Sequence, residues 1–272
     1  MPELPEVETT RRGIAPALEG RRVTAVTVRQ SQLRWPVPVG RLRRELVGQR
    51  VATVERRAKY LLLRTAAGTA LLHLGMSGSL RVIPAGTPAG FHDHLDLVLD
   101  DGACLRLRDP RRFGALLWTR RDPFLHPLLR ELGPEPFDPA FDGAYLRARA
   151  ERRRIAVKPF LMDGHVVVGV GNIYASESLH RAGIDPRRAA GRVALARYSR
   201  LADTVREVLG EAIDAGGTTL RDYTGGHGEN GWFSIHLAVY GRDGKPCLSC
   251  GTPVRCQVLG QRSTFFCPAC QR

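Results

Sequence analysis

The stretch VVVGVGNIYASE, residues 166–177, decides how the second half of the chain folds. Gly169 and Gly171 match the first two glycines of a dinucleotide-binding turn, but Tyr174 stands where that motif needs a third. What remains is a glycine turn that leads into a helix beginning near Asn172. Free backbone N–H groups at such a helix N-terminus can hold a phosphate, although an ordinary packing turn has the same sequence pattern.

The segments around this stretch have helical periodicity. Before them, the proline-rich and acidic stretch LGPEPFDPAFD (132–142) is typical of a linker, and after them Gly216 and Gly217 end the last helix. We expect helices over 143–152, 156–162, 172–182 and 192–215.

The first 131 residues have a different pattern, with one helix followed by strands. A helix is expected from Pro5 onward, because proline suits a first helical turn and Val7, Ile14 and Leu18 recur on one face. The runs that follow predict a sandwich of antiparallel sheets. The strand-like runs are 22–29, 51–54, 59–64, 69–74, 95–99, 104–107 and 115–119.

Four of the six cysteines lie close to the C-terminus. Cys247 and Cys250 form one Cys-x2-Cys pair, and Cys267 and Cys270 form a second after sixteen intervening residues. Four thiolates at this spacing suit tetrahedral Zn²⁺, and with no open position the metal would be structural. Disulfides or free thiols are the alternatives.

The residues between the two cysteine pairs predict a hairpin, QVLGQRSTFF (257–266), with Arg262 at or near its tip. An arginine on a rigid hairpin suits a DNA groove, although many zinc ribbons contact protein instead. The remaining cysteines, Cys104 and Cys256, are expected to be packed thiols rather than ligands.

The chain is strongly basic, which favours a polyanionic partner and above all nucleic acid. Among 272 residues, 41 are Lys or Arg and 27 are Asp or Glu, giving a formal net charge of +14. Lys59, Lys158 and Lys245 are its three lysines, and lysine offers a compact charge and an adjustable pKa that arginine lacks. A soluble protein that is merely basic is the alternative.

The sequence predicts a cytoplasmic protein. No stretch approaches the roughly 18–20 apolar residues of a membrane helix, and the acidic N-terminus lacks the apolar segment of a secretory signal.

Two turn-like stretches, HLGMSG (73–78) and DPRRFG (109–114), hold Met76 and Phe113. These side chains could belong to the core. An exposed apolar residue beside arginines is instead what a protein inserts to unstack a base pair. The sequence leaves both interpretations open.

Seven motifs together resemble the formamidopyrimidine-DNA glycosylase family, which is shared with endonuclease VIII. The resemblance runs from residue 2 to residue 270, and Leu4 and Val7 look like the glycosylase branch. In order, the motifs are PELPEVET, RRAKYLLL, HLGMSGSL, DPRRFGA, VGVGNIYASESL, GGTTLRDY and the four-cysteine ribbon.

This resemblance implies an α+β fold. The expected parts are a two-layered β-sandwich domain with an N-terminal helix (1–131), a linker (132–142), a helical domain with a helix–two-turn–helix (143–239) and a zinc finger (240–272). One structural Zn²⁺ and a monomer are expected.

The resemblance also implies catalytic roles. Pro2, exposed by loss of Met1, would attack C1′ of the damaged nucleotide, and Glu3 would be the acid or base on the deoxyribose. Lys59 would assist at the lesion phosphates, and Arg262 would act at the same site.

Further residues match family positions that hold DNA or the damaged base. The DNA-binding set is His73, Met76, Arg111, Phe113, Lys158, Asn172, Tyr240 and Arg262, of which Met76, Arg111 and Phe113 would fill the gap left by the flipped nucleotide. The lesion-pocket set is Glu6, Glu177, Thr218, Thr219, Arg221 and Tyr223.

The implied function is a bifunctional DNA glycosylase and abasic-site lyase that removes 8-oxoguanine and formamidopyrimidines from double-stranded DNA. An endonuclease VIII-like enzyme for oxidised pyrimidines, or a zinc-ribbon DNA-binding protein without catalysis, are the alternatives. The loop 221–231 departs from the family at Glu229 and Asn230, as does Ser234, which leaves base preference open.

Overall fold

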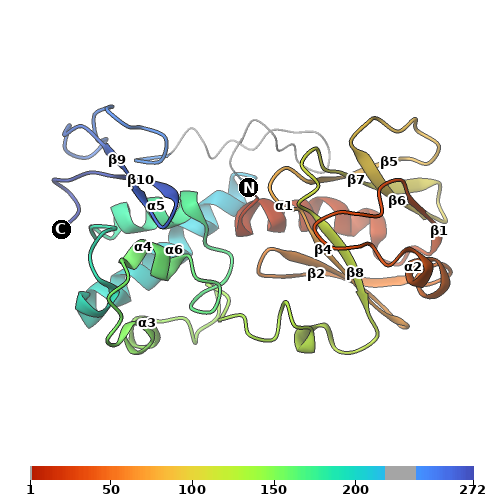
Figure 1. The fold of residues 1–272 in the computed structure, drawn as a ribbon, viewed down its shortest axis with the longest axis horizontal. Coiled ribbons are helices and arrows are strands. Elements are labelled where there is room, and N and C mark those ends of the chain that lie inside the picture. Colours follow the sequence, from red (N-terminus) through yellow and green to blue (C-terminus); the bar gives the residue numbers. More distant parts are fainter. Residues whose placement is uncertain (1, 218–236) are drawn as a thin grey trace. The chain divides into compact units, whose positions relative to one another are not determined.

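The protein, described here by a computed structural model over residues 2–217 and 237–272, forms two compact units (Figure 1). Among the described residues, unit 1 comprises 2–130 and 215–217, and unit 2 comprises 131–214 and 237–272. The finer division of the chain at residues 131, 142 and 239 stays a prediction.

Several sequence-based expectations fall outside the described residues. They are the state of Met1, the pocket roles of Thr218, Thr219, Arg221 and Tyr223, and the departures at Glu229, Asn230 and Ser234.

Unit 1 is the expected sandwich of two antiparallel four-stranded sheets. The first has the order β1-β6-β7-β5, and the second has the order β2-β3-β4-β8. The first sheet consists of β1 (Val23–Val28), β6 (Asp93–Leu99), β7 (Ala103–Arg108) and β5 (Ser79–Pro84). The second consists of β2 (Val51–Arg57), β3 (Tyr60–Thr65), β4 (Gly68–His73) and β8 (Ala115–Thr119).

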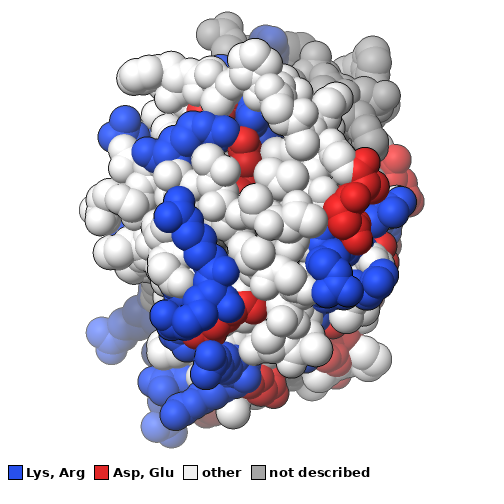
Figure 2. Space-filling model, turned by 90° about the vertical axis from the view of Figure 1, so that its right-hand side faces the viewer, with Lys and Arg blue, Asp and Glu red and all other residues white. Residues whose placement is uncertain are grey.

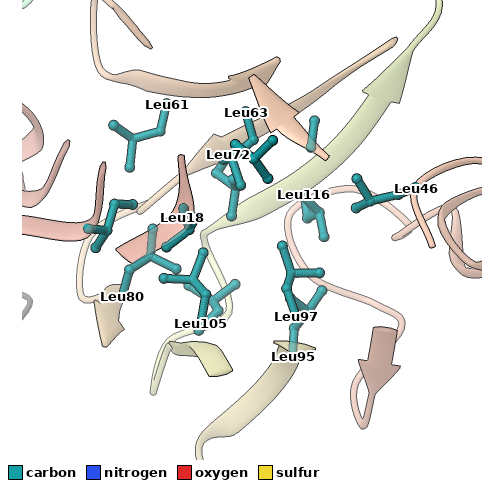
Figure 3. Packing of buried hydrophobic residues seen from close by; sticks show 14 of the residues in the cluster. Leu18, Leu46, Leu61, Leu63, Leu72, Leu80, Leu95, Leu97, Leu105 and Leu116 are labelled. Atoms are coloured by element: carbon teal, nitrogen blue, oxygen red, sulfur yellow. The ribbon is translucent and has the colours of Figure 1, made fainter. Parts of the chain in front are cut away.

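Leucines from both sheets form the core of unit 1 (Figure 3). Helix α1 (Leu4–Leu18) packs against β2, β3 and β5 and places Leu18, which has no exposed surface, among them. Leu61 and Leu72 of one sheet and Leu105 of the other are likewise fully buried. The apolar face that the sequence pattern predicted for α1 therefore closes the sandwich.

Two elements of unit 1 escaped the sequence analysis, namely β5 and the short helix α2 (Val39–Glu45). Strand β5 lies at a sheet edge and ends at Pro84, where a missing N–H costs no ladder bond. Helix α2 has no side-chain cap and depends on tertiary contacts: Leu42 is buried, and Glu45 accepts a 2.6 Å bond from Trp118 Nε1. A single turn of 3-10 helix, η1 (Pro123–Leu125), lies near the end of this part of the chain.

Unit 2 contains the expected helices and a terminal hairpin. The helices are α3 (Gly143–Ala150), α4 (Val157–Leu161), α5 (Asn172–Arg181), the 3-10 turn η2 (Ala190–Arg192) and α6 (Leu195–Asp214). Helix α5 packs against α6 on one side and against strand β10 (Arg262–Phe266) on another, and β10 pairs with β9 (Arg255–Leu259). Helix α5 thus contacts the hairpin of the zinc-finger segment through β10.

The face of unit 1 shown in Figure 2 carries charged side chains of both signs. Patches of Lys and Arg lie beside smaller patches of Asp and Glu, with uncharged surface between them. Total charge alone therefore does not identify the DNA-binding surface.

Among the described residues, no helix is long and apolar enough to span a bilayer.

The turn between β2 and β3 holds a non-glycine residue in the left-handed region. Ala58 has φ of 55°, and Arg57 pairs with Tyr60 across the two-residue turn that contains Lys59. Such a conformation costs an alanine about 1 kcal/mol, and strain of this kind is common next to functional groups.

Replacing Ala58 by glycine should leave the free energy of unfolding unchanged or raise it, because glycine adopts positive φ without strain. Chemical denaturation followed by tryptophan fluorescence measures this, since Trp35 and Trp118 both lie in unit 1. Ala25→Gly is the matched control: Ala25 is exposed on β1 opposite Val98, next to a register shift, and its φ is not positive. Replacing it by glycine should cost about 0.5–1 kcal/mol. An equal loss for both variants would contradict strain at Ala58.

Candidate functional site

The N-terminal residues are buried and held by a helix cap. Pro2 and Glu3 directly precede α1, and the Glu6 carboxylate accepts a 2.8 Å bond from the Glu3 N–H. Glu3 is 2% exposed and Glu6 is completely buried. The capping bond fixes the backbone beside Pro2, so the proline-started helix and the proposed nucleophile depend on the same contact.

Glu8 connects this helix to the turn that carries Lys59. Its carboxylate accepts bonds from Arg11 (2.8 Å), Arg12 (3.0 Å) and Arg56 (3.1 Å). Burial by itself would raise the pKa of Glu8, but these guanidinium groups hold it below its usual value. Arg56 also donates to the Ala58 carbonyl at 3.1 Å. The strained turn is therefore tied to α1 through two residues that the sequence analysis did not select.

His73 is an uncharged imidazole whose Nδ1 accepts a hydrogen bond. Its Nδ1 accepts a 2.9 Å bond from the Gly75 N–H, and its ring lies 4.8 Å from that of Tyr60. Burial, reinforced by the charges of Arg34 and Lys59, lowers the pKa of His73 to about 4. A neutral imidazole whose Nδ1 accepts must carry its proton on Nε2.

The turns that hold Met76 and Phe113 interlock. A Cβ on Gly75, which has φ of +65°, would lie 2.3 Å from the Phe113 carbonyl carbon, so only glycine permits this approach. Phe113 is 43% exposed, with Arg111 stacked 5.0 Å above its ring, and Met76 is half-buried. The core interpretation of Phe113 is therefore wrong, and the two turns bring Met76, Arg111 and Phe113 together.

Asp109 holds these turns in place. It is completely buried, and its carboxylate accepts bonds from the Ser77 hydroxyl (3.0 Å), the Arg111 N–H (3.3 Å) and the Gly114 N–H (2.7 Å). The sequence could have identified Asp109 as the residue that holds this turn, because it is the first residue of DPRRFG and aspartate often hydrogen-bonds the backbone of the turn that it begins.

Arg34 is a cation that the sequence analysis missed. It is exposed, its backbone N–H bonds the Gly114 carbonyl at 3.1 Å, and its charge lowers the pKa of His73. No motif marked it, because its neighbours in unit 1 come from distant parts of the chain.

In unit 2, Lys158 lies at the centre of a polar network. It is 1% exposed, and its Nζ donates to Asn172 Oδ1 (2.7 Å), the Ser263 carbonyl (3.0 Å) and Thr264 Oγ1 (2.9 Å). Three acceptors match the three N–H groups of an ammonium. Lys158 thereby joins the start of α5 to the finger hairpin.

Asn172 completes that network. Its Nδ2 donates to the Ser263 carbonyl at 3.1 Å and to the Tyr240 hydroxyl at 3.4 Å. Arg262 is exposed as the first residue of β10, directly after a turn in which Gly260 and Gln261 have φ of 55° and 62°. Both positive angles fit the tight turn that matches strand twist. The expected place of Arg262 near the hairpin tip is confirmed.

In the described residues, the Glu177 carboxylate forms hydrogen bonds with backbone N–H groups. Its carboxylate, on α5, accepts from the N–H groups of Ala238 (2.8 Å), Val239 (3.0 Å) and Tyr240 (2.8 Å). These contacts hold Tyr240 at the network around Asn172. Roles of Glu6 and Glu177 in a lesion pocket stay predictions.

The four C-terminal cysteines are positioned to bind one metal ion. Their sulfur atoms all lie within 4.8 Å of one another, with Cys247 and Cys270 3.9 Å apart and Cys250 and Cys267 3.5 Å apart. Tetrahedral Zn–S bonds of about 2.3 Å require sulfur separations of about 3.8 Å, so the donor set fits zinc. The predicted zinc site is confirmed.

The other two cysteines behave differently from each other. Cys104 is 1% exposed, as expected for a packed thiol, and burial raises its pKa to about 11. Cys256 is exposed, so the expectation that it is packed is wrong. It lies on β9, which in the described part of the chain pairs only with β10.

A helix-led β-sandwich followed by helices and a four-cysteine finger is the architecture of zinc-finger DNA glycosylases. Family models for the formamidopyrimidine-DNA glycosylase N-terminal domain, its H2TH domain, and the zinc finger found in FPG and IleRS match residues 1–116, 132–224 and 244–272. The chain belongs to the formamidopyrimidine-DNA glycosylase family.

Individual relatives agree along the whole chain. The formamidopyrimidine-DNA glycosylase of Alkalilimnicola ehrlichii is 63% identical, with all of both chains covered. The Thermus thermophilus FPG structure is 39% identical with a TM-score of 0.89, covering 99% of this chain and 98% of that one. A mutant of the Lactococcus lactis FPG in complex with DNA containing Fapy-dG is 31% identical with a TM-score of 0.93, covering all of both chains.

The pKa of His73 gives a testable prediction. Because the folded pKa of about 4 lies below the model-compound value of 6.5, the unfolded chain binds a proton between these pH values and the folded chain does not. The ring should therefore stay neutral, with Nε2 protonated, from pH 8 to pH 5, and this group lowers stability as pH falls from 6.5 to 4. Ring nitrogen NMR of the folded protein measures it.

The control is the same chain unfolded in urea, where the histidines should titrate near 6.5. A His73 ring in the folded protein that charges near pH 6.5 would contradict the neutral-donor assignment.

Proposed function

We propose that the chain removes oxidised purines, 8-oxoguanine and formamidopyrimidines, from double-stranded DNA and cleaves the strand by β,δ-elimination. Its enzyme class, a DNA glycosylase of base excision repair with abasic-site lyase activity, follows from family membership. The observation that carries the proposed mechanism is Pro2 at the start of α1, next to the buried carboxylate of Glu3.

Pro2, made the N-terminal residue by removal of Met1, is the proposed nucleophile. An N-terminal amine has a pKa near 7.7–8.0, so a useful fraction is neutral at physiological pH. Its nitrogen attacks C1′ and the bond from C1′ to the base breaks. Because proline is a secondary amine, its adduct with the opened sugar is an iminium that keeps a positive charge. That charge withdraws electrons from C2′, so a proton leaves there and the 3′ phosphate departs, followed by the 5′ phosphate.

Glu3 and Lys59 complete the proposed catalytic group in unit 1, with Arg262 acting from unit 2. Glu3 protonates the ring oxygen of the deoxyribose as the sugar opens, and it adjoins Pro2 in the chain, so it is within reach. Lys59 holds the phosphates at the lesion from the turn that Arg56 and Glu8 secure.

The damaged base must leave the helix before Pro2 can reach its sugar. Flipping a nucleotide costs a few kcal/mol, which side chains inserted into the gap and arginines on the phosphates offset. We assign the insertion to Met76, Arg111 and Phe113. The exposed Phe113 ring and the interlocked turns beneath it support this assignment.

Phosphates are held by His73, Asn172, Tyr240 and Arg262. His73 acts as a neutral donor and Arg262 as a cation. The three donors of Lys158 already bond protein atoms. Lys158 therefore acts as a positioning residue that orients Asn172 and the finger hairpin.

The lesion pocket is proposed to include Glu6 and Glu177, with Thr218, Thr219, Arg221 and Tyr223. DNA carrying an abasic site or Fapy-dG was crystallised with the Lactococcus lactis relative, which supports such DNA as the partner here. We further propose a monomer located in the bacterial cytoplasm and associated with the nucleoid through DNA.

Borohydride trapping on lesion-containing duplex tests the nucleophile. Pro2→Gly should lower the trapped adduct on the order of tenfold or more, because its primary amine forms an imine that readily loses its charge. Pro5→Ala is the matched control: Pro5 lies in the same segment without a free amine, so its adduct should equal that of the original chain. An adduct undiminished by Pro2→Gly would remove Pro2 from the mechanism.

Excision assays distinguish the proposed substrates from those of an endonuclease VIII-like enzyme. The rate on 8-oxoguanine paired with cytosine should exceed the rate on thymine glycol by at least about tenfold, which corresponds to roughly 1.4 kcal/mol of discrimination. Comparable rates, or a preference for thymine glycol, would overturn the purine assignment while leaving the Pro2 mechanism intact.

A further inference from the structure

We infer that His180 is an outer-sphere partner of the zinc site: its Nε2–H donates a hydrogen bond to the Cys247 thiolate. His180 lies in the last turn of α5, is 9% exposed, and its Nε2 is 3.6 Å from Cys247 Sγ. It is not among the four residues positioned to bind the ion.

The chemistry of the finger sets the direction of this bond. Cysteines that bind zinc do so as thiolates, which can only accept hydrogen bonds. When the site is loaded, the proton between Cys247 Sγ and His180 therefore lies on Nε2. A four-thiolate zinc site carries excess negative charge, and a donated N–H reduces the charge on the sulfur that receives it.

The contact between His180 and Cys247 is buried. Cys247 is 3% exposed, so the contact is shielded from water. Beside it, Gln271 accepts a 2.8 Å bond from the Cys267 N–H and donates a 2.8 Å bond to the Ile184 carbonyl just beyond α5. Gln271 is 2% exposed. Two buried polar contacts thus join the finger to the end of α5 and the residues just after it: His180 with Cys247, and Gln271 with Ile184.

The contact also connects the metal to the proposed phosphate-binding end of α5. Asn172 and His180 are eight residues apart on one helix, which corresponds to about 12 Å along its axis. Lys158 holds the hairpin at one end of this helix, and His180 holds Cys247 at the other. His180 is therefore a positioning residue for the finger as well as a partner of its thiolate.

Zinc release to a chromogenic chelator, in the absence of DNA, tests the inference. His180→Leu removes the donor at similar volume and should release zinc about 10–100-fold faster, the usual effect of losing an outer-sphere partner. His180→Gln keeps an amide N–H near the position of Nε2 and should restore most of the slow release. Cys256→Ser is the control, because Cys256 is an exposed cysteine of the same finger outside the ligand set.

Two further measurements keep the test decisive if His180→Leu fails to fold. In the Co²⁺-substituted protein, the sulfur-to-metal charge-transfer band of His180→Gln should lie closer to that of the original chain than the band of a variant without a side-chain N–H at position 180, such as His180→Leu. In the original zinc-loaded protein, ring nitrogen NMR should find Nε2 of His180 protonated and Nδ1 unprotonated. Zinc release within twofold of the original for His180→Leu, or an unprotonated Nε2, would overturn the inference. None of these readouts involves DNA, so they do not depend on the proposed catalytic mechanism.

Discussion

A polar or ionised group that is removed from water must make its hydrogen bonds inside the protein, and this constraint organises both units. Glu6 caps the helix beside Pro2, and Asp109 binds the turns that present Met76 and Phe113. In unit 2, Lys158 and Glu177 hold Asn172 and Tyr240. Each buried group has several partners, so the residues proposed to meet DNA are attached to fixed backbone.

In this arrangement the buried charged residues and the exposed charged residues have different roles. Buried charges such as Asp109 and Lys158 are occupied by protein atoms and set geometry. Exposed cations such as Arg111 and Arg262 are, with the uncharged His73, the groups that we propose to bind phosphates. The separation suits an enzyme that must distort its substrate, because the cost of flipping a nucleotide is offset only by contacts whose positions are already set.

Much of the fold could be predicted from local pattern. Helix α1, the helices of unit 2 and seven of the eight sandwich strands follow from periodicity and turn residues. The cysteine spacing predicted the metal site, because zinc geometry constrains spacing directly. Strand β5 and helix α2 were missed, because an edge strand and a short uncapped helix depend on contacts made only after the chain has folded.

The sequence by itself determined the residue types and their order: a proline at position 2 beside a glutamate, a glycine turn before α5, and four cysteines at zinc spacing. Only the tertiary structure decided which charges are free and which are occupied. It left Phe113 exposed, buried the ammonium of Lys158, kept His73 neutral and brought His180 against Cys247. The physical reason is that burial and pairing depend on groups from distant parts of the chain, and neither composition nor spacing encodes that neighbourhood.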